Sequence, residues 1–318
     1  MTTNIKIISG LIMNEITSTR HNHLIDPSLQ IWNWEIPVYL FLGGMVAGMM
    51  LISGYFLFKG REKEANCSCF YLPYISIILL SLGMLALFLD LEHKLYVWRL
   101  YTTFEITSAM SWGSWILVLV YPMLIANVLL KPPAALSEKF PILNKPKEFF
   151  FSKPMRIKSF GVLTMFFGAG IGLYTGVLLS SLGARPLWSS SILWMLFLVS
   201  GLSGAAAFVH VIAKNVFERE LLAKADNAFL IIELFVIALF IVGLKTATEV
   251  QASAADLLLT GNYSSTFWVF VIGMGIVIPL IIQMLAVNHK IKHTPIAPLM
   301  VILGGLVLRF VIVSAGQF

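Results

Sequence analysis

The residues best suited to chemistry in this sequence are polar groups set within long apolar segments. Tyr174 lies in the stretch IGLYTGVLLSSLGARPLW, about two turns before an apolar segment ends, and Arg185 follows that segment. Gly168, Gly172 and Gly176 repeat every fourth residue, a spacing that lets a neighbouring helix approach closely. A phenol at such a seam, near an arginine, suits a flat ligand that carries oxygen atoms, such as a quinone. A tyrosine that only anchors its helix at a membrane interface is the simpler alternative.

The composition predicts an integral membrane protein. Hydrophobic residues make up 58% of the 318 residues and charged residues only 12%, whereas soluble domains are about half apolar and a quarter charged. The net charge of +6 does not indicate a nucleic-acid partner, because the basic residues are confined to particular loops. We therefore expect a multi-pass membrane protein surrounded by lipid.

Eight segments are long enough to cross a bilayer, which takes about 20 apolar residues each. They cover approximately residues 34–58, 71–91, 108–130, 157–181, 191–213, 228–249, 266–288 and 295–315. The predicted fold is all-α, with eight transmembrane helices in two four-helix bundles. The first bundle takes residues 32–130 with 157–182, and the second takes 183–318. Residues 1–31 are predicted to be a polar lead and 131–156 a cytoplasmic linker loop.

The distribution of basic residues predicts the orientation. Of the 22 Lys and Arg residues, 15 fall in the loops after the first, third, fifth and seventh segments. Cytoplasmic loops carry the excess of Lys and Arg. Both termini are therefore expected outside.

With this orientation, several polar side chains reach the same outer level. Glu35 and Tyr39 are four residues apart and share a helix face, and Asp90 ends the second segment. Helix geometry places Tyr39 and Tyr174 on the order of 10 Å below the outer surface. The predicted catalytic residues are Tyr174, Tyr39, Glu35 and Asp90, and the predicted binding residues add Trp34, Ser111, Trp112 and Arg185. Because polar groups inside a membrane are costly, their default interpretation is functional, the alternative being interfacial residues that snorkel.

The second half has its own polar residues. Glu233, with His210 and Gln283 as candidate partners at a similar depth, indicates either a proton route or a structural polar cluster. Only His210 of the six histidines is clearly within a segment, too few for a membrane haem. Cys67 and Cys69 are too few for a zinc site or an iron–sulfur cluster and are predicted to be free thiols. No metal site is expected in this chain.

Five motifs in order along the chain resemble the NrfD/polysulfide reductase membrane-subunit family. They are WNW (32–34) leading into YLFLGGMVAG (39–48), LDL (89–91), SAMSWGSW (108–115), Tyr174 with RPLW (185–188), and LRFVIVSAGQ (308–317). The resemblance covers nearly the whole chain. It implies a quinone-binding subunit of a bacterial inner membrane, without a redox centre of its own. It also implies a ferredoxin-like iron–sulfur partner on the outer face, linked to a molybdopterin enzyme or a multihaem cytochrome.

The resemblance also assigns roles to residues. Tyr174 matches the tyrosine that holds the quinone head group in family members, and Tyr39 falls where some members have a histidine. Ile36 replaces a polar residue found in some members, and Glu35 beside it is the candidate substitute. The expected cofactor is a quinone, with menaquinone favoured over ubiquinone. The alternatives are a secondary transporter, which predicts inverted repeats and broken helices, and a membrane anchor without a quinone site.

Overall fold

The computed structural model describes residues 32–61, 67–287 and 294–317, so the predicted polar lead 1–31 lies outside the described residues. Eight helical stretches in the described part are long and apolar enough to span a membrane, and no strand occurs there. They are α2 (Glu35–Phe58), α3 (Leu72–Asp90), α5 (Ala109–Val128), α8 (Pro154–Ser180), α9 (Leu193–Ile212), α10 (Val216–Thr246), η5 (Thr266–Val277) continued by α12 (Ile278–Val287), and α13 (Ile296–Ala315). The predicted all-α membrane fold is confirmed.

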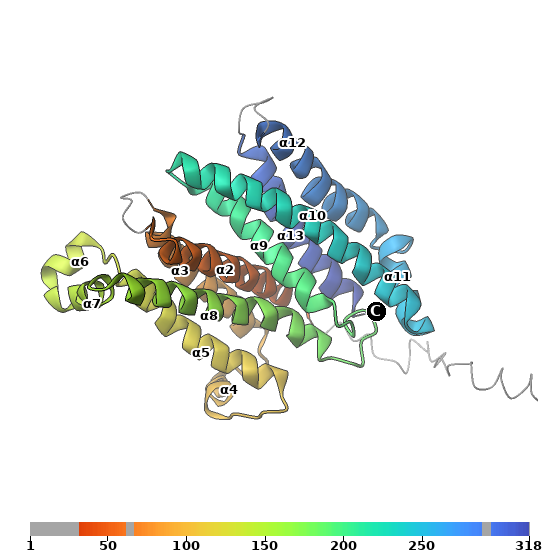
Figure 1. Ribbon diagram of the computed structural model, residues 1–318. Coiled ribbons are helices and arrows are strands. Elements are labelled where there is room, and N and C mark those ends of the chain that lie inside the picture. Colours follow the sequence, from red (N-terminus) through yellow and green to blue (C-terminus); the bar gives the residue numbers. More distant parts are fainter. Residues whose placement is uncertain (1–31, 62–66, 288–293, 318) are drawn as a thin grey trace, which may run out of the picture.

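Shorter helices lie in the connections. They are η2 (Ser68–Phe70), η3 (Lys94–Tyr96), α4 (Arg99–Thr102), α6 (Ala134–Lys139), η4 (Pro141–Asn144), α7 (Lys145–Phe151) and α11 (Glu249–Leu259). The 131–156 linker therefore contains helices of its own, and α8 already begins within it. The connection between α3 and α5 folds beside the start of α5, where α4 packs (Figure 1).

For description, the spans are divided into a first group of α2, α3, α5 and α8 and a second group of α9, α10, η5 with α12, and α13. In the first, α2 packs against α3 and α8, and α5 packs against α3 and α8. In the second, α9 packs against α10 and α13, and α13 packs against η5 and α12. Figure 1 shows the first group in orange to green and the second in green to blue. Helix α9 also contacts both α2 and α8, so the two groups share an extensive interface.

Two glycine rows bring helices close together: the Gly168 row of α8, whose spacing predicted this, and Gly44 with Gly48 of α2. A Cβ atom at Gly168 of α8 would come within 2.8 Å of the Met50 Cβ atom on α2. A Cβ atom at Gly48 of α2 would lie 2.8 Å from the Gly201 carbonyl oxygen and overlap Ala205 on α9. A larger residue at either position would push these helices apart, so the rows set how closely α2 packs against α8 and α9.

The start of the first span and the end of the last lie together. The Trp32 amide donates to the Gln317 Oε1 atom at 2.9 Å, and the Gln317 Nε2 atom donates to the Trp32 carbonyl oxygen at 2.8 Å. The Trp32 ring stacks on Trp188, with 5.1 Å between ring centroids. The two ends of the eight-span region therefore lie at the same end of the helices.

The predicted start of the sixth span is wrong, because α10 begins earlier. The sixth span was expected to begin at residue 228, but the helix begins at Val216, so Arg219 and Lys224 lie on it rather than in a loop. Asn215 caps the helix by accepting from the Phe217 amide at 3.0 Å. The charged residues of this first part made it resemble a loop, yet Glu218 and Asp226 are buried against hydrogen-bond donors of other segments.

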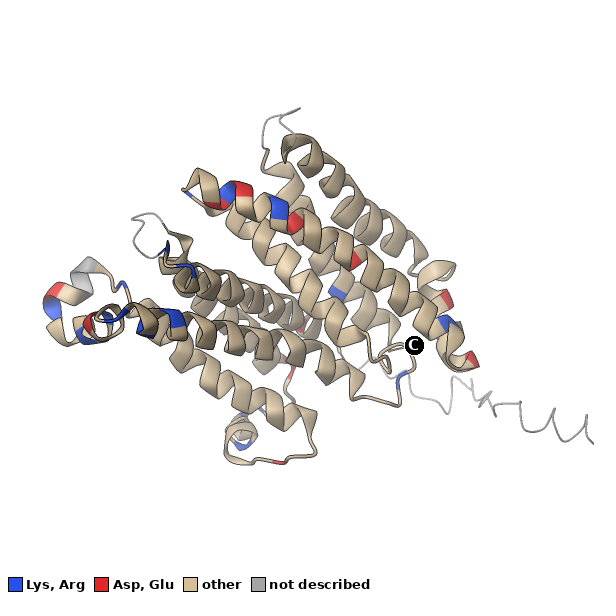
Figure 2. Ribbon diagram, viewed as in Figure 1, with Lys and Arg blue, Asp and Glu red and all other residues tan. Residues whose placement is uncertain are grey.

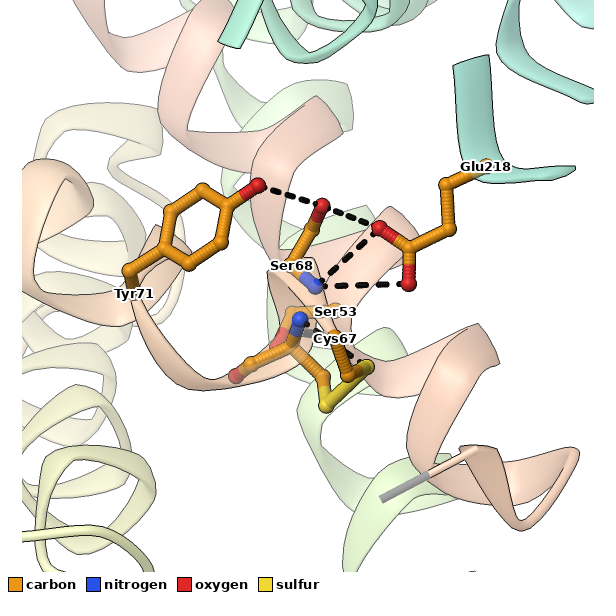
Figure 3. The surroundings of a disulfide bond; sticks show 6 residues. Ser53, Cys67, Ser68, Tyr71 and Glu218 are labelled. Atoms are coloured by element: carbon orange, nitrogen blue, oxygen red, sulfur yellow. Dashed lines mark hydrogen bonds between the residues drawn. A yellow bond between two sulfur atoms is a disulfide. The ribbon is translucent and has the colours of Figure 1, made fainter. Parts of the chain in front are cut away.

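The prediction that Cys67 and Cys69 are free thiols is wrong, because the structure joins them in a disulfide with a Cα to Cα distance of 5.3 Å (Figure 3). Ser68 stands between them. Its amide donates to the Glu218 Oε2 atom at 3.1 Å, and its hydroxyl group also contacts that carboxylate. The Tyr71 and Ser68 hydroxyl groups are 2.8 Å apart. This network connects the turn between α2 and α3 to the start of α10.

The orientation prediction can be tested with topology reporters. Figure 2 shows Lys and Arg gathered in the linker and at helix ends, with little charge in the middle of the spans. A reporter fused after Gln317 should report an external location, and one inserted near Asn144 a cytoplasmic one, because cytoplasmic loops carry the basic excess. Alkaline phosphatase and fluorescent-protein fusions in intact cells make the measurement. The reverse pattern would place the residues near Tyr174 toward the cytoplasm and refute the predicted orientation.

Candidate functional site

The predicted catalytic residues come from three spans of the first group. Glu35 and Tyr39 lie in the first two turns of α2, Asp90 is the last residue of α3, and Tyr174 lies on α8. Both phenol side chains are buried, with Tyr39 only 3% and Tyr174 only 7% exposed. Because α2 contacts both α3 and α8, the structure brings the ends of these three helices together.

Tyr174 is held against α5 by a glycine. The Tyr174 ring occupies the space where Gly113 would carry a Cβ atom, so any larger residue at position 113 would overlap the ring. The Tyr174 hydroxyl group has no hydrogen-bond partner among the described residues. The side chain as a whole is buried, but its hydroxyl oxygen is not among the fully enclosed atoms that lack a partner, so it can be reached from outside. The ring is thus fixed in position while its hydroxyl group remains available to a ligand.

Tyr39 and Tyr101 complete a cluster of three phenols with Tyr174. Tyr39 interacts electrostatically with Tyr174 and with Tyr101 of α4. A phenol is protonated at neutral pH and can donate a hydrogen bond, and burial raises the pKa of the Tyr101 phenol further. Tyr101 was not predicted from the sequence. The density of aromatic residues between the second and third spans was the signal that could have indicated it.

Two carboxylates lie at the mouth of this cluster. Glu35 and Asp90 are close enough to interact electrostatically. The Glu35 Oε2 atom is buried and has no hydrogen-bond partner among the described residues. An unpaired buried oxygen costs about 1–3 kcal/mol, which is the cost that a bound hydrogen-bond donor would remove.

A cavity of about 590 Å³ opens at this end of the molecule. Polar side chains that line it include Asp90, Glu92, His93, Tyr96, Arg99, Thr103, Glu105, Ser108 and Ser111. Ser108 caps α5 by accepting from the Ser111 amide, and the Ser111 hydroxyl group accepts from the Glu105 amide at 2.9 Å. These bonds fold the 103–107 loop back over α5 and shape one wall of the cavity.

The remaining predicted binding residues lie elsewhere. Trp34 is exposed at the start of α2. Trp112 is also exposed and donates from its Nε1 atom to the Ile106 carbonyl oxygen at 2.8 Å, so it braces the loop. Arg185 donates to the Gln317 carbonyl oxygen at 2.7 Å and lines a different cavity, of about 420 Å³, with Trp32 and Trp188. The structure does not place these three side chains beside Tyr174.

The second group contains a separate buried polar network. Arg309 donates to the Phe197 carbonyl oxygen at 2.9 Å and also contacts the Ser200 hydroxyl group, which in turn pairs with Glu233. Gln283 was a candidate partner of Glu233, but its amide donates to Asp226 at 2.8 Å instead. Ser203 also donates to Asp226, at 2.9 Å. The network thus consists of two clusters on α10, one around Glu233 and the other around Asp226.

The family model described as "Polysulphide reductase, NrfD" matches residues 19–318, nearly the whole chain. The chain belongs to the NrfD family. The resemblance that the sequence motifs indicated is therefore confirmed.

Two of the three relatives described below for this NrfD-family protein are named as parts of reductases. It is 30% identical to a chain of the polysulfide reductase of Wolinella succinogenes, over 90% of this protein and 94% of that relative. It is 28% identical to protein NrfD of Escherichia coli, over 90% of this protein and 95% of that relative. It is 23% identical to a subunit of the selenate reductase of Mesobacillus selenatarsenatis, over 97% of this protein and 77% of that relative.

Proposed function

We propose that this chain is the quinone-binding membrane subunit of a respiratory oxidoreductase complex and exchanges electrons between the quinone pool and a peripheral iron–sulfur subunit. The observation that carries the proposal is the Tyr174 phenol, which is fixed against Gly113 and whose hydroxyl group has no hydrogen-bond partner among the described residues. The buried Oε2 atom of Glu35, at the start of α2, also lacks such a partner. A quinone offers two carbonyl oxygens and a quinol two hydroxyl groups, which complement such a set. Relatives named as parts of polysulfide and selenate reductases support the assignment to an oxidoreductase complex.

The phenols and the carboxylates have different tasks in this proposal. Tyr174 binds one quinone oxygen and Tyr39 the other, because a phenol can donate and accept hydrogen bonds without carrying a charge. A quinol bound there supplies two electrons and two protons when it is oxidised. The two electrons pass to the iron–sulfur partner. The Glu35 Oε2 atom accepts the two protons one after the other, and Asp90 at the wall of the cavity passes each of them toward water. Menaquinone remains the favoured quinone.

The surface beside the cavity is the proposed docking face for the iron–sulfur partner. Several large apolar side chains of the connection between α3 and α5 are exposed, among them Leu95 at 88%, Trp98 and Ile106. Exposed apolar and aromatic side chains that gather on one surface mark interaction sites. A redox partner bound here would lie directly above the phenol cluster, as short-range electron transfer requires.

The partner assignment is tested by purification. The native chain, isolated from its own membranes in mild detergent, should bring with it an iron–sulfur protein detectable by iron content and by its spectrum. Substituting Leu95 and Trp98 together by Ser should reduce the recovered iron severalfold or more, because the exposed apolar contacts would be lost. Substituting Ile142 and Met155 by Ser, both exposed near the linker, is the matched control and should leave it unchanged. Recovery of the chain without any iron-containing or haem-containing partner would contradict the proposal.

The quinone site is tested by Tyr174→Phe, which removes one hydroxyl group and keeps the ring that packs on Gly113. The variant should insert and assemble normally but lose quinone affinity. A neutral hydrogen bond contributes about 0.5–1.5 kcal/mol, and more where a buried group is left unpaired, so affinity should fall roughly severalfold to a hundredfold. Quinol oxidation or quinone reduction in membranes, normalised to assembled protein, makes the measurement.

Two further variants help to explain a loss of quinone affinity in Tyr174→Phe. Tyr39→Phe should cause a smaller loss, because Glu35 or water can replace its hydroxyl group. Ser180→Ala is the control, since the Ser180 hydroxyl group only donates to the Val177 carbonyl oxygen of its own helix. Unchanged turnover and quinone affinity in Tyr174→Phe would return Tyr174 to the role of an ordinary interfacial anchor.

A further inference from the structure

A second cavity, of about 560 Å³, lies where several spanning helices end on the linker side of the molecule. Its walls come from the start of α3, the residues after α5, the α6–α7 segment and the turn between α9 and α10. It is therefore at the level where the apolar spans give way to loops, the depth of lipid headgroups. Neither quinone binding nor the family assignment involves it.

The cavity is basic. Lys131, Lys147 and Lys214 line it, each from a different segment, and no Asp or Glu is among the described lining residues. Lys147 and Lys214 form no ion pair with any carboxylate in the described part of the chain. The Lys131 ammonium group lies 4.8 Å from the centroid of the Phe70 ring, which also lines the cavity. Positive charges gathered around one cavity repel one another, and a bound anion would relieve that repulsion.

The wall that the lysines face is held in place by hydrogen bonds. The Tyr74 hydroxyl group donates to the Lys131 carbonyl oxygen at 2.7 Å, which fixes the chain where α5 ends. The Tyr71 hydroxyl group pairs with Ser68, which the buried Glu218 carboxylate holds from α10 (Figure 3). The cavity thus combines a prearranged polar wall with long cationic side chains.

We propose that this cavity binds the phosphate headgroup of an anionic phospholipid of the surrounding membrane. Basic pockets between helices at the membrane surface bind such headgroups. Below the cavity, α3 and α5 expose apolar side chains, among them Ile78, Leu82 and Ile125, on which the acyl chains can lie. This apolar continuation selects a lipid over a free phosphate, because the lipid gains contacts along the helices and is concentrated at the bilayer surface.

The bound lipid would hold the linker to the body of the protein. Lys147 lies on α7 in the linker, Lys131 at the end of α5 in the first group, and Lys214 at the turn into α10 in the second group. One phosphate contacted by all three side chains connects three parts of the chain that are distant in sequence. The lipid therefore acts as a structural ligand whose effect on stability is separate from quinone turnover.

The test uses the full chain purified with its partners in mild detergent. Phosphatidylglycerol, phosphatidylcholine or inorganic phosphate is titrated, and the shift in the thermal unfolding midpoint gives the apparent affinity. Phosphatidylglycerol should bind the wild type at least tenfold more tightly than phosphatidylcholine. Lys131→Gln, Lys147→Gln and Lys214→Gln together should weaken phosphatidylglycerol binding about a hundredfold, at about fivefold per lysine. The midpoint without added lipid should change little.

The matched control is Lys139→Gln with Lys153→Gln and Lys158→Gln, which removes the same charge from lysines that do not line the cavity. Its affinity for phosphatidylglycerol should be within a few-fold of that of the wild type. Equal weakening in both triple variants would show attraction to the general surface charge and overturn the proposal. If inorganic phosphate raises the thermal unfolding midpoint as much as phosphatidylglycerol does, the cavity is a free-anion site and the proposal is overturned. Should the triple variant fail to assemble, Lys147→Gln with Lys214→Gln alters only two exposed side chains, and unchanged lipid binding in that variant would refute the proposal.

Discussion

Gly113→Ala is expected to reduce quinol turnover about a hundredfold or more, beyond the effect of removing the Tyr174 hydroxyl group. The added Cβ atom would occupy the space of the Tyr174 ring, so the ring must move away from α5. A misplacement of about 1 Å in a reacting constellation can cost about a hundredfold in rate. Turnover per assembled complex, measured in membranes, checks the expectation.

This variant separates displacement of the Tyr174 ring from a general change in helix stability. Alanine favours a helix over glycine by about 0.5–1 kcal/mol, so the helix itself should not be weakened. Gly170→Ala is the matched control, because a Cβ atom there meets nothing within 4 Å and the residue lies one turn before Tyr174 on the same helix. Full activity in Gly113→Ala would show that the position of the Tyr174 ring is irrelevant to turnover.

Arg309→Met is expected to cause the largest loss of stability of any single substitution considered. Arg309 is 1% exposed, donates to the Phe197 and Gly305 carbonyl oxygens and interacts with Glu233. Arg309 reaches Glu233 through the Ser200 hydroxyl group rather than in a direct ion pair. Removing one of two buried charges that compensate each other costs up to about 3–5 kcal/mol, because the other charge is left without compensation. The amount of inserted protein and its thermal unfolding midpoint are the measurements.

Two companion variants test the mechanism. Adding Glu233→Gln to Arg309→Met should recover part of the lost stability, since no uncompensated carboxylate remains. Lys245→Met breaks an exposed ion pair with Asp256, whose side chains are 37% and 51% exposed, and should cost at most about 1 kcal/mol. Stability of Arg309→Met equal to that of Lys245→Met would contradict the structural role assigned to the buried network.

The spans and the glycine rows were predictable because their signals are local. A run of apolar residues determines a crossing by itself, and glycines at every fourth residue determine which helix face can be approached. The first part of α10 was missed for the opposite reason. Glu218 and Asp226 look like loop residues until their partners Ser68 and Ser203 are known, and those partners are distant in sequence.

The phenols and carboxylates of the candidate site could be predicted from the sequence, but the packing contacts that hold them in position could not. Tyr39, Tyr174, Glu35 and Asp90 were indicated by their depth in apolar segments. The contact between Gly113 and Tyr174 joins two helices whose relative rotation no local pattern specifies. The placement of Arg185 against Gln317 depends on where the chain ends fold, which is likewise a long-range property.

The quinone content of the purified complex is the direct test of a quinone site at Tyr174. Complexes carrying the wild-type chain, Gly113→Ala or Gly170→Ala are isolated from the same membranes in mild detergent, and their quinone is extracted and quantified per complex. We expect bound quinone in the wild-type complex and in the Gly170→Ala complex. The Gly113→Ala complex should have lost most of its quinone. Equal quinone in all three complexes, or none in the wild type, would contradict a quinone site at Tyr174.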